Sequence, residues 1–268
     1  MKDNYFEEVN QSWRTSEFKL DDREDPDMKS QKLITDLANT FCDNKKTPSG
    51  NILSVKNIEQ TRQTRDQKKR WYAKVQVHDG NQNYIATFGV TADYIGASIH
   101  WAQEAGISQA EILDHIAISR TLEGHLLFPT WYSTKDGTKS WSSNENTPIS
   151  INIARGGEDT YFDRIDYTLW ALKQWYSSAS EETKLSADIN KNRLWFELFC
   201  SFDDFIKYFK LESLLTENGD IVDLTSFNPN NNTFSAIITD ESKIRLPQDS
   251  QYQNYIEGCN FFISSRVL

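Results

Sequence analysis

The chain has 268 residues, of which 38% are hydrophobic and 13% aromatic, and it carries a formal net charge of -10. This length and apolar content are enough for one large domain or two modest ones with a buried core. The negative charge argues against a protein that coats nucleic acid through its overall field, although it leaves room for a local basic site.

The cysteines and the N-terminal residues bear on where the protein works. Cys42, Cys200 and Cys259 are far apart, odd in number and without metal-ligand spacing, so we expect reduced thiols and no metal site. The first residues lack the apolar core of a signal peptide. No run approaches the ~18 apolar residues of a membrane span. We therefore expect a soluble, cytoplasmic protein with no membrane contact.

The N-terminal third contains one predicted helix and three predicted strands. Residues 1–29 are polar and acidic, and we expect an irregular lead-in there. Ser30 is a predicted N-cap, because an apolar stripe with a period of 3.6 residues follows it. Strand patterns then cover residues 52–55, 71–77 and 84–90. The last two strands are joined by Asp79-Gly80-Asn81, a sequence typical of hairpin turns.

Two helices and two strands are predicted in the middle of the chain. Thr91 is expected to open a helix that carries Tyr94 and Ile95, and Ser108 with Glu111 forms the capping box of a second one. Residues 124–131 and 149–154 have strand patterns. The segment between them, 133–147, is rich in Lys, Asn and Ser and predicts an exposed loop.

The C-terminal part is predicted to be mainly helical. Apolar residues between Phe162 and Tyr176 follow helical spacing, aromatic residues crowd positions 194–209, and a final helix is expected over 250–264. A short strand is expected over 233–238. The whole pattern predicts an α+β fold in which residues 30–268 form a single compact domain. Its short mixed or antiparallel sheet lies in the N-terminal and central parts.

Four motifs give the chain a family resemblance. They are Asp-Pro-Asp-x-x-Ser at 25–30, Gly-His-x-x-Phe-Pro at 124–129, Ser-Ile-Asn-x-Ala-Arg-Gly at 150–156 and Asp-Arg-x-Asp-x-Thr-Leu at 163–169. With them the chain resembles a family of uncharacterised bacterial proteins. The resemblance covers most of the chain and implies a shared fold and a shared site, but no assigned reaction.

The last three motifs also hold the candidate site, which begins with a predicted anion site. Arg155, Gly156 and Gly157 stand between a predicted strand and a predicted helix. Glycines let backbone N–H groups approach a ligand, and an arginine can bind a phosphate or carboxylate with two hydrogen bonds. Asn152 and Arg164 are further candidates for substrate binding. The alternative is that Gly-Gly forms an ordinary turn.

His125 and Asp166 are the candidates for proton transfer. His125 begins a predicted strand and Asp166 lies in the first turn of a predicted helix, near the anion site in sequence. The alternative is structural, because acidic residues in a first turn suit the helix dipole, and Arg164 would then pair locally. Arg120 and His125 match the Arg-x-x-x-x-His pattern of HEPN ribonucleases. That pattern works on a helix, so we interpret the match as a coincidence.

A basic segment precedes the second predicted strand. Arg62, Arg65, Lys68, Lys69 and Arg70 are followed by Trp71 and Tyr72. Such a segment can contact nucleic acid through phosphates and stacking, or it can be a solvated loop that leads into a strand. The net charge does not favour nucleic acid as the partner, and the sequence leaves the oligomeric state open.

Together these features predict an enzyme that acts on a nucleotide-like or other phosphate-bearing substrate. No P-loop, dinucleotide fingerprint or serine-hydrolase elbow is present in the sequence. NAD is a candidate substrate in the version of this hypothesis that involves ADP-ribosyl transfer, an activity that suits a toxin or a phage-defence effector. The alternative is a non-enzymatic protein-interaction module whose polar cluster is structural.

Overall fold

We describe the fold from a computed structural model. The structure describes residues 4–9, 29–60, 70–96, 102–103, 105–135, 139–141, 164–177, 189–190, 192–240 and 249–268. Its helices are α1 (Phe6–Val9), α3 (Gln31–Phe41), α5 (Gln109–Ser119), α6 (Ile165–Tyr176), α8 (Arg193–Phe196), α9 (Phe202–Phe209), α10 (Asp249–Ser265) and the short 3-10 helices η1 (Leu122–Gly124), η2 (Glu212–Leu214) and η3 (Leu224–Ser226). Its strands are β1 (Lys45–Lys46), β2 (Ile52–Gln60), β3 (Trp71–His78), β4 (Tyr84–Tyr94), β5 (His125–Thr134), β6 (Lys139–Trp141), β7 (Phe227–Asn228) and β8 (Thr233–Phe234).

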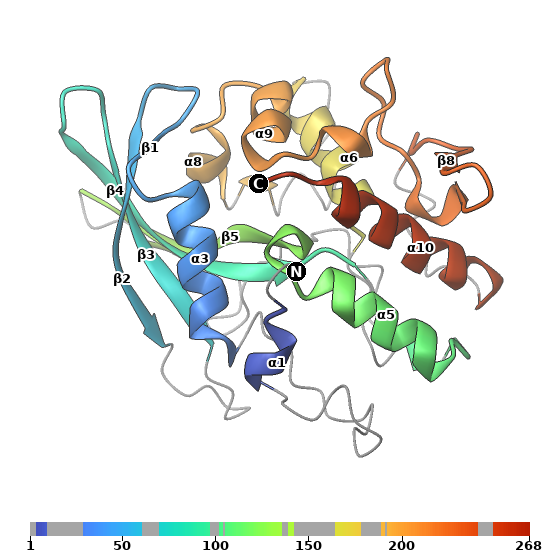
Figure 1. Cartoon of the computed structure of the whole chain (residues 1–268). Helices are drawn as coiled ribbons and strands as arrows, with labels where there is room; N and C mark the ends of the chain where they lie inside the picture. The colour runs from blue at the N-terminus through green and yellow to red at the C-terminus, as the bar shows by residue number, and fades with distance from the viewer. Residues whose placement is uncertain are drawn as a thin grey trace.

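The main sheet is an antiparallel meander. Strands β1 to β6 lie in sequence order, and every neighbouring pair is antiparallel. Helices α6, α9 and α10 follow it in the chain, and β7 and β8 form a small separate sheet (Figure 1). This confirms the predicted α+β class, with an antiparallel sheet in the N-terminal and central parts and a mainly helical C-terminal part.

The predicted helix at Thr91 is wrong, because β4 continues to Tyr94. Residues Thr91 to Tyr94 pair with Phe128 to His125 of β5, beyond a register shift between Gly89 and Val90. A bulge of this kind lets a strand bend and continue. Pairing with β5 thus outweighs the apolar spacing that had suggested a helix.

The segment expected to be a loop, 133–147, contains strand structure. β5 extends to Thr134, and β6 pairs with Trp131, Tyr132 and Ser133. The predicted strand at 149–154 lies outside the described residues. The lead-in expected over 1–29 includes helix α1, whose first residue Phe6 is buried, as is Tyr5 just before it.

The helix starts predicted at Ser30 and Ser108 and the predicted hairpin turn after His78 are confirmed. The Ser30 hydroxyl accepts a hydrogen bond from the backbone N–H of Leu33, and Ser108 and Glu111 form a complete capping box. In the β3–β4 hairpin, the Asp79 carboxylate accepts backbone N–H groups from Asn81 and Asn83. These local side-chain bonds satisfy donors that helix starts and turns leave unpaired.

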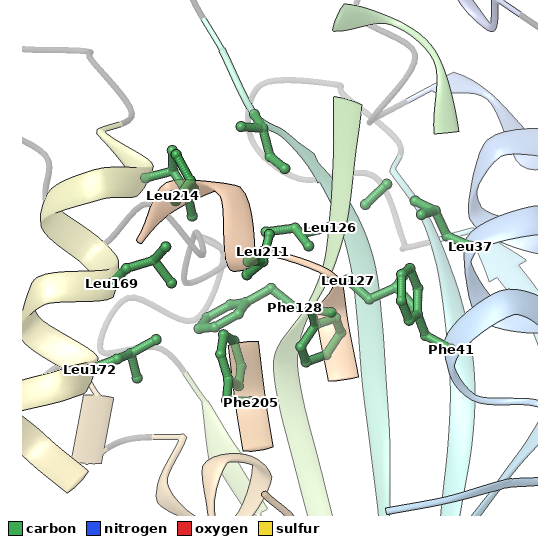
Figure 2. Packing of buried hydrophobic residues seen from close by; sticks show 14 of the residues in the cluster. Leu37, Phe41, Leu126, Leu127, Phe128, Leu169, Leu172, Phe205, Leu211 and Leu214 are labelled. Atoms are coloured by element: carbon green, nitrogen blue, oxygen red, sulfur yellow. The ribbon is translucent and has the colours of Figure 1, made fainter. Parts of the chain in front are cut away.

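The core encloses the first half of β5 on both of its faces. Leu127 points toward Leu37 and Phe41 of α3, while Leu126 and Phe128 point toward residues of the C-terminal helices (Figure 2). A strand that is buried on both faces has consecutive apolar residues in its sequence, because successive side chains point to opposite faces. This is why Leu126, Leu127 and Phe128 are all apolar.

Two further features concern the chain as a whole. All three cysteines are free thiols, as predicted, with Cys42 and Cys259 buried and Cys200 exposed. Among the helices that the structure describes, none combines the length and apolar character needed to cross a membrane.

Candidate functional site

A buried ion pair stands at the start of α6. Arg164 is the N-cap residue of this helix and Asp166 lies in its first turn. The Arg164 Nε and Nη2 atoms donate to the two Asp166 carboxylate oxygens at 2.9 and 2.7 Å. The exposed fractions of the two side chains are only 3% and 0%. Such a two-bond contact fixes both side chains in one geometry.

The ion pair extends to a distant segment of the chain. Arg164 Nη2 also donates to Asp223 at 2.9 Å, and the backbone N–H of Leu224 donates to Asp166 at 3.0 Å. The backbone N–H of Tyr167 donates to the other Asp166 oxygen. Each oxygen of Asp166 therefore accepts two hydrogen bonds. The network ties α6 to η3 and matches the local Arg164 pairing of the structural alternative.

Aromatic rings complete the surroundings of Arg164. Its guanidinium lies 4.7 Å from the ring centre of Tyr167 and 5.3 Å from that of Tyr255 in α10. Burial opposes the charge of Arg164, but the Asp166 carboxylate outweighs this effect and holds the pKa of the guanidinium above its ordinary value. Arg164 is therefore a permanent cation inside the protein.

His125 has partners of its own, at the start of β5. Its side chain is fully buried, and Nδ1 lies 2.7 Å from the carbonyl oxygen of Thr121. Because a carbonyl can only accept, Nδ1 carries the proton and Nε2 presents a lone pair. Within the described part of the chain, Nε2 is buried and has no hydrogen-bond partner. The structure thus fixes the direction of the Nε2 lone pair, which accepts no hydrogen bond from the described residues.

Arg266 holds the backbone at His125. Its Nη1 atom donates to the carbonyl oxygens of His125 and Glu123, at 2.7 and 2.6 Å, and Nε and Nη2 both donate to Phe209. Burial lowers the pKa of Arg266 to about 9, and Glu123 and Glu212 offset only part of this effect. One cation therefore joins the segment after α10 to the end of α9 and to the start of β5.

Burial also sets the charge of His125. Burial is the main reason that the pKa of the imidazole is lowered from 6.5 to about 3; the Thr121 hydrogen bond opposes this effect, and the positive charges of Arg120 and Arg266 add to it. Between these pH values the unfolded chain binds a proton that the folded chain excludes. The stabilising contribution is thus complete above pH ~6.5 and falls by about 1.4 kcal/mol per unit as the pH drops toward 3.

This linkage predicts a pH-dependent stability. From pH 7 to pH 5, the wild-type free energy of unfolding should fall by about 2 kcal/mol more than that of His125→Asn, whose amide can still donate to Thr121. Urea unfolding at both pH values measures the difference. Equal pH slopes in wild type and His125→Asn would contradict a neutral buried His125.

The structure thus brings Arg164 and Asp166 together and gives His125 separate partners. Asn152, Arg155, Gly156, Gly157 and Asp163 lie outside the described residues, as does any contact of Arg155 with Asp166. Arg120 lies at the end of α5 and His125 in a strand, so their spacing is not helical. Among the described residues, no group of three or more His, Cys, Asp and Glu is placed to hold a metal ion.

Two residues of these networks had no signal in the sequence. Asp223 follows no recognisable motif, and Arg266 resembles any charged residue at a helix end. Both act across more than fifty residues of chain, since Asp223 is 59 positions from Arg164 and Arg266 is 141 positions from His125. Only an aligned set of relatives or a structure brings such pairs together.

Comparison with known proteins places the chain in a family. No curated protein and no solved structure matches it. The sequence pattern of a family of unknown function (DUF6994) matches residues 14–267, which is nearly the whole chain. The expected resemblance to a family without an assigned reaction is confirmed at this level. The chain therefore belongs to this family of unknown function.

Proposed function

We propose that the protein is an enzyme that acts on a nucleotide-like or other phosphate-bearing substrate. The observation that supports this proposal is the buried Nε2 of His125, which has no hydrogen-bond partner among the residues that the structure describes. Leaving a buried polar atom unpaired costs about 1–3 kcal/mol, so such an atom calls for an explanation such as a missing ligand or a catalytic role. A substrate hydroxyl or amino group that reached Nε2 would supply the missing donor.

His125 has the features of an oriented proton acceptor. The hydrogen bond to Thr121 fixes the tautomer, and Arg266 fixes the backbone that carries the ring. A neutral imidazole can accept a hydrogen bond from a substrate, and an anionic substrate nearby would raise its low pKa toward neutrality. We assign His125 to proton transfer for this reason.

Phosphate binding in this proposal belongs to Arg155, Gly156 and Gly157, with Asn152 orienting the substrate. This assignment rests on the sequence, in which an arginine and two glycines precede a helix. Arg164 and Asp166, which we had expected to bind substrate and move a proton, have their charges committed to each other and to Asp223. We therefore assign them to holding the start of α6.

A narrower version of the proposal has NAD as the substrate and ADP-ribosyl transfer as the reaction. Enzymes of this class bind NAD without a glycine-rich dinucleotide fingerprint, which this sequence also lacks. A toxin or phage-defence role would suit that chemistry. The catalytic glutamate that such a reaction needs has no assigned position in this chain.

A ligand screen tests the proposal. NAD, nucleotides or sugar phosphates should raise the melting temperature, and a hundredfold excess over the dissociation constant contributes about 2.7 kcal/mol. The shift should vanish in Arg155→Ala and persist in His125→Asn, because His125 is assigned to proton transfer. Arg193→Ala, which removes an exposed arginine of α8, is the matched control and should respond as the wild type does. If none of these ligands raises the melting temperature, the proposal is overturned.

The second candidate function is a non-enzymatic protein-interaction module. The observation that favours it is the closed Arg164–Asp166–Asp223 network, which explains two site candidates by structure alone. A negative ligand screen, together with a His125→Asn variant that is less stable at pH 7 than the wild type, would make this candidate the better one.

A further inference from the structure

Positive charge is concentrated in one part of the main sheet. Residues 45–78, which include β1, β2 and β3, contain nine Lys and Arg and only two Asp and Glu. The whole chain has 29 Lys and Arg against 39 Asp and Glu. A cationic region in an acidic protein attracts anions locally while the overall field repels them. The net charge of the chain therefore conceals a strongly basic region.

Several of these cations are exposed on the structured strands. Lys45 and Lys46 form β1 at the sheet edge, and Lys56 lies at a register shift of β2; all three are exposed. The connection between β2 and β3 contains Arg62, Arg65, Lys68 and Lys69 in sequence. Its ends are fixed, because Gln60 pairs with Trp71. The basic connection therefore leads directly into the strand that carries Tyr72.

Aromatic rings lie on the sheet face reached from that strand. We call this surface the Tyr72–Trp131 face; it comprises Glu59, Tyr72, Lys74, Gln76, Thr87, Gly89, Trp131 and Ser133. Cross-strand register places these residues on one side of β2 to β5. The Tyr72 and Trp131 rings meet edge to face with centres 6.0 Å apart, and both side chains are half-buried. None of the eight residues belongs to the hydrophobic core of the described chain.

The backbone is adapted to hold Trp131 flat on this face. Gly89 pairs with Trp131, and a Cβ atom built on Gly89 would lie 2.1 Å from the indole Nε1. Only glycine lets the indole lie directly over the β4 backbone. Tyr72 is held as well, because its hydroxyl donates to Glu59, which also accepts from Lys74. The two rings are therefore fixed before any partner arrives.

We infer that the Tyr72–Trp131 face and the exposed lysines of the neighbouring described strands, Lys45, Lys46 and Lys56, bind single-stranded nucleic acid. The cations suit a phosphate backbone, and fixed aromatic rings suit unpaired bases, which stack on them without sequence preference. Duplex nucleic acid keeps its bases inside the helix and offers no such stacking partner. A neutral carbohydrate would use the rings but leave the cations without a role. This surface is separate from His125 and does not depend on the proposed enzyme activity.

Fluorescence anisotropy with labelled oligo(dT) and oligo(U) longer than about 16 nucleotides tests the inference. The protein should bind both, and affinity should fall steeply between about 50 and 200 mM salt. Lys45→Glu/Lys46→Glu should weaken binding and reduce the slope of log K against log salt by about 1.4, the value for two lost single-strand phosphate contacts. Trp131→Ala should weaken binding about tenfold and leave this slope unchanged, because stacking releases no counterions.

Matched variants separate this surface from general effects. Lys207→Glu/Lys210→Glu makes the same charge change on exposed residues in and just after α9, and Trp175→Ala removes a half-buried tryptophan of α6. Both should bind as the wild type does. Each variant must first be shown to melt at the wild-type temperature; otherwise its measured affinity is corrected for the unfolded fraction. Absence of binding at low salt overturns the inference. So does equal weakening by the two control variants, preference for duplex, or binding of neutral oligosaccharides in place of oligonucleotides.

Discussion

Replacing Asp166 by alanine is expected to lower the free energy of unfolding by about 3–5 kcal/mol, because the buried Arg164 loses its two-bond partner and keeps only the partly exposed Asp223. Arg164 is only 3% exposed, and an arginine guanidinium keeps its proton in proteins, so Arg164 cannot escape the cost by losing its charge. The change also removes the acceptor for the backbone N–H groups of Tyr167 and Leu224. Urea unfolding measures the loss.

An exposed ion pair provides the control for this result. Arg193 and Glu197 stand one turn apart on and just after α8, with side chains 69% and 45% exposed. Glu197→Ala should cost less than about 1 kcal/mol, as usual for surface pairs. The double variant Arg164→Met/Asp166→Leu should recover part of the loss, because neither fully buried charge remains and Asp223, which loses Arg164, is partly exposed. An Asp166→Ala variant as stable as Glu197→Ala would show that the network contributes nothing.

Gly124→Ala is expected to destabilise the protein by about 3 kcal/mol or more. A Cβ atom at this position would lie 1.8 Å from the carbonyl oxygen of Ser119 and 2.6 Å from its carbonyl carbon. Both atoms belong to the backbone at the end of α5, so no side-chain rotation can relieve the overlap. Overpacking of this kind usually costs about 1–3 kcal/mol, and contact between two backbones belongs at the upper end.

A second glycine distinguishes this steric effect from the general effect of adding a methyl group. Gly80 lies in the β3–β4 turn, and a Cβ built there meets nothing within 4 Å. Gly80→Ala should therefore change the stability by no more than about 0.5 kcal/mol. Thermal and urea unfolding of both variants give the comparison. A Gly124→Ala variant that matched Gly80→Ala would mean that the α5–β5 connection is free to shift.

The parts of the fold that sequence predicts well are those fixed by neighbouring residues. Ser30, Ser108 and Asp79 each bond to backbone groups two to four positions away, so their roles can be read from local spacing. Thr91 was misread because its strand depends on pairing with Phe128, far along the chain. Local propensity cannot weigh such pairing against helical spacing.

In the candidate site, too, the local contacts could be predicted and the contacts between distant residues could not. Local pairing of Arg164 with Asp166 follows from their positions in one helix turn. Burial of His125, its unpaired Nε2 and the clamp by Arg266 depend on packing against α10 and α9, which the sequence does not reveal. The sequence could therefore name His125 as a candidate but could not show that the imidazole is enclosed and neutral.

The strand order of the main sheet has a consequence for how the chain folds. Because β1 to β6 lie side by side in sequence order, most of their pairings close short loops. Among the described residues of these connections, helical structure occurs between β4 and β5 alone. By contrast, α10 meets partners more than a hundred residues away, such as His115, which lies 145 positions from Asn260. Closing longer loops costs more chain entropy, and contacts between distant residues slow folding. The meander thus has the low contact order of a unit that forms fast. The docking of α10, which joins residues far apart in the chain, is the step expected to slow folding.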